Sequence, residues 1–154
     1  MCMKKFLSVI LGLTLVFSLV GCGSMNKEVL TTESFQTYFE GKEDYKVFDI
    51  TYQCEGQNMK AALASDDIKD GYSLEYYIYE DEASAQKMYD ETVEIIAQFV
   101  KEPLVEEGEN YKKYSGANSS IYWSLTKVEN TVLYCEAALV NQEEISLAVK
   151  GLGY

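Results

Sequence analysis

The chain has 154 residues, of which 47% are hydrophobic, 13% are aromatic and only one is a proline, so it is expected to fold around a buried core. Its formal net charge is −12, every basic residue is a lysine, and histidine is absent. This composition argues against nucleic-acid binding, which needs a basic surface, and against chemistry that depends on an imidazole.

The N-terminal stretch MCMKKFLSVILGLTLVFSLVGCGS has the pattern of an export signal. Two lysines, Lys4 and Lys5, precede an uncharged apolar run from Phe6 to Val20, and small residues follow it. This run is shorter than the roughly 20 apolar residues that a transmembrane helix needs. We therefore predict a signal peptide over residues 1–21.

The tetrad at the end of that run, Leu19-Val20-Gly21-Cys22, resembles the lipobox of bacterial lipoproteins. In that family the signal peptide is cut just before the cysteine, whose thiol carries a diacylglyceryl group. The resemblance therefore implies cleavage between Gly21 and Cys22, and a lipid on Cys22. Two acyl chains are enough to hold a protein stably on a membrane. The alternative is an ordinary signal peptide, or an uncleaved anchor, with an incidental cysteine.

The whole chain is similar to the small envelope lipoproteins of Gram-positive bacteria. That resemblance implies a position on the extracytoplasmic face of a bacterial cell membrane and no defined activity. Without residues 1–21, the chain keeps 11 basic and 25 acidic residues, a net charge of −14. An anionic membrane surface would repel such a domain, so we expect a lipid to provide the attachment. Residues 22–30 are predicted to be the lipidated cysteine and a short tether, and residues 31–154 a single domain.

Hydrophobic periodicity predicts the elements of this domain in chain order. A short helix over 32–40 precedes strands over 45–54, 58–65 and 72–80; a long helix over 82–101 follows. The rest of the chain is predicted to contain a loop over 106–110, a strand over 111–115, a hairpin over 119–140 that bends at Glu129 and Asn130, and a helix over 142–150. The order is α-βββ-α-βββ-α. Strands with no helix between them pair antiparallel, so we predict an α+β fold, an antiparallel sheet with its helices packed on one face.

Two cysteines, Cys54 and Cys135, fall on strand faces that are predicted to be buried. In an exported protein they could form a disulfide, or they could remain free thiols that pack as small apolar groups. A catalytic cysteine is not expected, because no histidine is present to activate it.

The acidic stretch DDIKDG, which starts at Asp66, has some features of a calcium-binding loop. Asp66, Asp70 and Gly71 would stand at its first, fifth and sixth positions. However, Ile68 and Tyr77 occupy positions where such a loop needs oxygen ligands, so we predict a turn. No metal ion and no cofactor are expected.

The thirteen tyrosines are the most unusual feature of the composition. Tyr77, Tyr79 and Tyr122 are predicted on the sheet face opposite the helices, where they could form an exposed aromatic binding face. We therefore expect a non-catalytic binding or interaction module, whose partner is an envelope protein, a peptide or a glycan. The alternatives are a hydrolase of the envelope that uses two carboxylates, and an inhibitor or assembly factor for another envelope protein.

Overall fold

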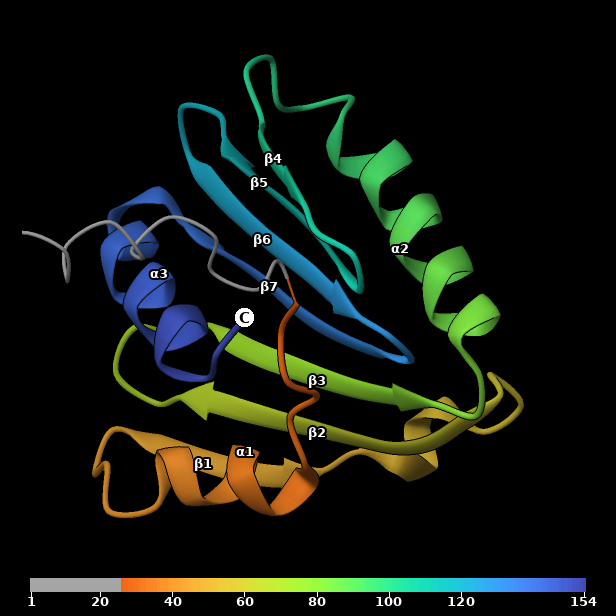
Figure 1. Ribbon diagram of the computed structural model, residues 1–154. Coiled ribbons are helices and arrows are strands. Elements are labelled where there is room, and N and C mark those ends of the chain that lie inside the picture. The colour runs from red at the N-terminus through yellow and green to blue at the C-terminus, as the bar shows by residue number, and fades with distance from the viewer. Residues whose placement is uncertain (1–25) are drawn as a thin grey trace, which may run out of the picture.

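The structure is a computed structural model that describes residues 26–154, and these form a seven-stranded antiparallel sheet with three α-helices (Figure 1). The helices are α1 (Thr32–Phe39), α2 (Glu82–Ile96) and α3 (Gln142–Gly151). The strands are β1 (Tyr45–Asp49), β2 (Met59–Asp67), β3 (Ser73–Tyr79), β4 (Leu104–Glu107), β5 (Tyr111–Ala117), β6 (Ile121–Val128) and β7 (Thr131–Ala138). They lie in the order β1-β2-β3-β7-β6-β5-β4. The predicted α+β class with an antiparallel sheet is confirmed.

The predicted signal peptide, its cleavage site between Gly21 and Cys22, and Cys22 itself lie outside the described residues. From residue 26 onward, no helix combines the length and the apolar character that crossing a bilayer requires.

The helices cover both faces of the sheet, not one face as predicted. Phe35 of α1 and Ile145 of α3 belong to one buried cluster, with Tyr76 and Leu133 of the sheet. A second buried cluster joins α2 to the opposite face. The central strands β3, β6 and β7 carry apolar or aromatic residues on both sides, and each side needs a cover.

The register of the β6–β7 hairpin explains why the prediction that all helices pack on one face of the sheet is wrong. Ser124 pairs with Cys135, and directly paired residues point to the same side of a sheet. Trp123 and Leu125 therefore point to the side opposite Cys135, where they pack beneath α2. Periodicity within each strand is correct, but it does not say how the faces of two strands match.

Two further elements differ from the prediction. The strand expected over 45–54 ends at Asp49, and Thr51–Cys54 forms a 3₁₀ turn. β4 lies partly within the predicted loop over 106–110 and makes the count of strands after α2 four. It is an exposed edge strand, in which the acidic pair Glu106 and Glu107 lies opposite two lysines of β5. Cross-strand pairs of opposite charge favour pairing at such an edge.

The segment expected to be a free tether is partly docked on the domain. The backbone N–H of Lys27 donates to the Asn110 side chain (2.9 Å), and the Lys27 ammonium donates to the carbonyl of Gly153 (3.0 Å). The hydroxyl of Tyr76 donates to the carbonyl of Leu30. These contacts attach the segment to the side of the sheet that α1 and α3 cover.

Candidate functional site

A cavity of about 430 Å³ lies between α2 and the sheet, and we identify it as the candidate site. Its floor comes from β3, β6 and β7, and its wall from α2 and the residues that follow it. The floor residues are Glu75, Tyr77, Ile121, Trp123, Tyr134 and Glu136, and the wall residues include Met88, Thr92, Ile95, Ile96 and Phe99. We call this cavity the α2 groove.

The position of α2 over the sheet is fixed at both ends. At its start, the Asp81 carboxylate accepts the backbone N–H of Ser84 (2.7 Å), which caps the helix. The ammonium of Lys127 on β6 lies 2.7 Å from a carboxylate oxygen of Glu82. Beyond the end of α2, Val100 lies so close to Gly116 of β5 that a Cβ there would come within 2.4 Å of a Val100 methyl. These contacts hold both ends of the groove wall against the sheet.

Two glutamates in the floor are oriented by aromatic donors. The same carboxylate oxygen of Glu136 accepts the indole N–H of Trp123 (2.9 Å) and the hydroxyl of Tyr134 (3.1 Å). The Tyr77 hydroxyl donates to Glu75. Burial, strengthened by these glutamates, raises the pKa of both tyrosines, so they remain protonated donors at neutral pH.

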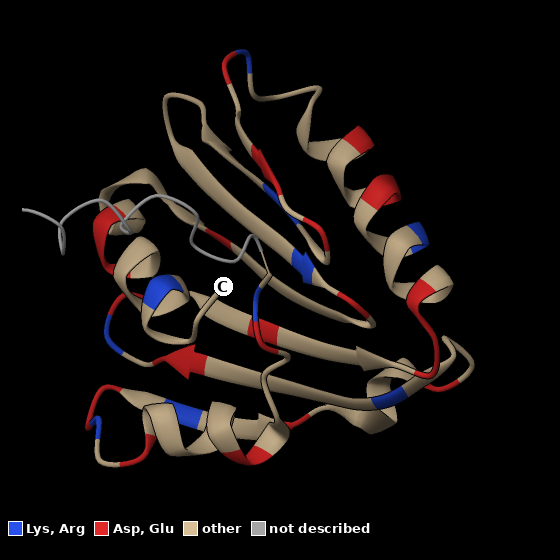
Figure 2. Ribbon diagram, in the orientation of Figure 1, with Lys and Arg blue, Asp and Glu red and all other residues tan. Residues whose placement is uncertain are grey.

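The groove carries negative charge without a basic partner. No lysine lines it, and among the ion pairs found in residues 26–154 none includes Glu75 or Glu136. Acidic residues also outnumber lysines along α2, which forms the wall of the groove (Figure 2). A pair of carboxylates oriented on an aromatic floor favours a cationic group over a neutral or anionic one.

The rim of the groove is apolar. Phe99 stacks on Trp123 with a centroid distance of 6.0 Å and an interplanar angle of 19°, yet 53% of Phe99 remains exposed. Ile95 is likewise exposed. A larger cavity of about 850 Å³ shares Phe99 and Asn118 with the groove, but it also includes Tyr122 and Ser146 from the other side of the sheet. We therefore treat it as separate from the α2 groove.

The structure does not bring the three predicted tyrosines together. Tyr77 lines the α2 groove, but Tyr79 is buried beneath α2. Tyr122 points to the other side of the sheet, where it is also buried, and its hydroxyl lies 3.3 Å from that of Ser146 on α3. The prediction that Tyr77, Tyr79 and Tyr122 form an open face is therefore wrong, because α2 covers Tyr79 and Tyr122 lies on the other side of the sheet. The aromatic residues that line the groove with Tyr77 are Trp123 and Tyr134.

Sequence reasoning missed Glu75 and Glu136 as members of this site. Each is an acid inside a strand that is otherwise apolar or aromatic, on the side where an aromatic residue is its neighbour two positions away. That pattern was a usable signal for Glu75, which is partly buried and therefore benefits from a hydrogen-bond donor, but not for Glu136, which is exposed.

The structure contains Cys54 and Cys135 as free, buried thiols and not as a disulfide. Cys54 lies in the 3₁₀ turn that follows β1, whereas Cys135 lies on β7 and belongs to the cluster beneath α1 and α3. Burial raises the pKa of both thiols, that of Cys135 to about 12, which makes them poor nucleophiles.

Comparison with known proteins adds little. No protein-family model matches the sequence, and no curated protein matches it either. A solved structure from Thermotoga maritima, described as a GTP binding regulator, aligns over 84% of this chain and 90% of its own, with 14% identity and a TM-score of 0.48. A similarity of this size carries no information about function.

Proposed function

We propose that the protein is a lipid-anchored, non-catalytic binding module of the bacterial cell envelope, and that the α2 groove binds a basic peptide segment of a partner protein. The observation that carries the proposal is the pair Glu75 and Glu136, set on an aromatic floor with no lysine in the lining. A lysine side chain of the partner would supply the cation that the groove lacks.

A peptide fits this depression better than a compact molecule does. The exposed rim residues Ile95 and Phe99 offer apolar contact beside the charged floor. A segment with a basic residue next to an apolar one would use both features.

The docked N-terminal segment supports a function at the membrane surface. Lys27 and Leu30 are attached to the side that α1 and α3 cover, opposite the α2 groove. If Cys22 carries the lipid, the chain between Cys22 and the docked Lys27 is four residues long and can reach at most about 14 Å. The groove would then open away from the anchored side, where a partner can reach it.

The peptide proposal is tested with two labelled decapeptides that differ only in having two lysines or two glutamines beside a phenylalanine. The wild-type chain should bind the lysine peptide at least about tenfold more tightly, and E75Q/E136Q should lose this preference. E91Q/E94Q is the matched control, because it removes the same charge from exposed positions of α2 outside the groove. Equal binding of both peptides, or an equal effect of the control, would refute the proposal. Cleavage of the peptide would favour the hydrolase alternative.

The membrane proposal has its own test. Native material should stay in the membrane at high salt, dissolve in detergent, and give an N-terminal peptide that starts at a diacylglyceryl-modified Cys22. C22A should abolish the modification. An intact leader, or release by salt alone, would contradict the lipid anchor.

A further inference from the structure

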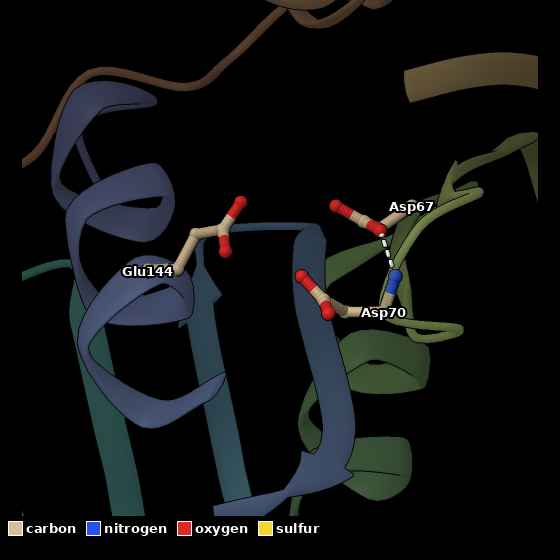
Figure 3. Close-up of side chains that lie close together, drawn as sticks. All are labelled: Asp67, Asp70 and Glu144. Carbon is tan, nitrogen blue, oxygen red and sulfur yellow. Dashed lines mark hydrogen bonds between the residues drawn. The ribbon is translucent and has the colours of Figure 1, made fainter. Parts of the chain in front are cut away.

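Three carboxylates from separate parts of the fold meet away from the α2 groove. Asp67 ends β2, Asp70 lies in the turn before β3, and Glu144 lies in the first turn of α3. One oxygen of each lies within 4.8 Å of one oxygen of each of the others. Figure 3 shows the three carboxylates around a common space between α3 and the turn that contains Asp70.

Asp67 is the unusual member, because it is only 3% exposed. Its Oδ1 accepts the backbone N–H groups of Lys69 (2.8 Å) and Asp70 (2.6 Å), which fixes the orientation of the carboxylate. Its Oδ2 is buried and has no hydrogen-bond partner. In Figure 3 this free oxygen points toward Glu144, into the space between the three acids. A buried carboxylate oxygen without a partner is costly, and a cation would remove that cost.

The positive charge near the cluster is small. The Lys69 ammonium lies 3.7 Å from Asp70, and both side chains of this pair are partly exposed to water. Lys42 lines the depression beside Glu144, but its ammonium lies over the Tyr38 ring, 3.5 Å from the centroid, and forms none of the salt bridges found in residues 26–154. The Tyr45 hydroxyl donates to Glu144 (2.8 Å) and is hydrogen-bonded to the hydroxyl of Tyr72. These two neutral tyrosines orient Glu144 as an outer shell does in metal sites, and they leave its negative charge in place.

We propose that Asp67, Asp70 and Glu144 bind a calcium ion. The donors are all carboxylate oxygens, which suit a hard divalent cation, and neither a thiolate nor an imidazole takes part. Calcium binds oxygen at about 2.3–2.6 Å, so two of its ligands are at most about 5 Å apart. The 4.8 Å limit of the cluster meets this requirement. Backbone carbonyls and water would complete the usual coordination of about six to eight oxygens.

The bound ion would join α3 to the turn between β2 and β3. It would therefore act as a structural clamp, and stability would depend on calcium concentration through binding to the folded state alone. With one buried and two exposed ligands, the expected Kd is on the order of 0.1–1 mM, the range of extracellular calcium modules.

The test uses the full chain, purified in detergent and freed of metal with a chelator. At 5 mM CaCl₂ the Tm, followed by the fluorescence of Trp123, should rise by about 3–6 °C and saturate. Titration calorimetry should show at least a tenfold weaker affinity for E144Q, which changes an exposed residue and should leave the chain folded. D67N should also lose binding if it folds.

The matched controls are D66N and E143Q, which remove neighbouring acids of the same two elements and should bind calcium as the wild type does. The proposal is overturned if calcium gives no saturable shift beyond that of NaCl at equal ionic strength, or if E144Q binds as well as E143Q. An equal response to MgCl₂ would overturn the assignment to calcium.

Discussion

The ion pair that holds α2 to the sheet makes an asymmetric prediction. The Lys127 side chain is 4% exposed, whereas that of its partner Glu82 is 64% exposed. Removing the carboxylate with E82Q leaves a buried ammonium with only a neutral acceptor. Breaking a fully buried pair costs about 3–5 kcal/mol, but water can reach this one from the Glu82 side, so we expect about 1–2 kcal/mol.

Removing the lysine of this pair should lower the free energy of unfolding by less than removing the glutamate does. K127M keeps most of the buried stem, removes the buried charge, and leaves the Glu82 carboxylate in water, so we expect a cost below about 1 kcal/mol. E33Q is the matched control, because Glu33 lies in the first turn of α1 and forms none of the salt bridges found in residues 26–154. This variant should lose only the interaction of the acid with the helix dipole, about 0.3–1 kcal/mol.

The assay is urea unfolding followed by the fluorescence of Trp123, the single tryptophan, which is buried beneath α2. The free energies of unfolding should rank E82Q below K127M, with both m-values unchanged. If K127M is the more destabilised variant, or if E82Q equals E33Q, the pair does not hold α2 in the way described.

Two further predictions concern pH and thiol chemistry. Burial raises the pKa of several tyrosines above 10, and that of Tyr89 to about 12. These tyrosines therefore lose their protons first in the unfolded state. Their contribution to the free energy of unfolding is complete below about pH 10 and is lost as the pH rises toward the pKa values of the folded state. Circular dichroism and tyrosinate absorbance should therefore change together above about pH 10; ionisation near pH 10 without unfolding would contradict this. Without reductant, iodoacetamide should label Cys54 and Cys135 slowly in the native chain and completely in urea, as peptide masses would show. A cross-linked Cys54–Cys135 peptide would instead show that the two thiols form a disulfide.

Local signals in the sequence predicted most of the elements. The long helix predicted from residue 82 does begin there, with Asp81 as its cap, and the predicted turn in DDIKDG forms, with Gly71 at a φ of +73°. The bend at Glu129 and Asn130 is also confirmed, and Glu129 has a positive φ of 50° there. These features depend on a few neighbouring residues and on backbone geometry, which the sequence displays directly.

The α2 groove and the carboxylate cluster depend on contacts between distant residues. Glu75 and Glu136 share a floor only because β3 pairs with β7, and Glu144 meets Asp67 only because α3 packs next to the β2–β3 turn. Neither pairing leaves a local trace, so acids that are far apart in sequence could not be recognised as neighbours.

The sequence by itself determined most of the secondary structure, the acidic charge and the α+β class, because periodicity and composition act within one element or over the whole chain. Tertiary structure alone decided which side of each strand faces which helix. A one-residue change in hairpin register exchanges every side chain between the two faces, and this register is set by packing across the sheet. That packing placed Trp123 beneath α2 and Cys135 on the opposite side, and so created the groove.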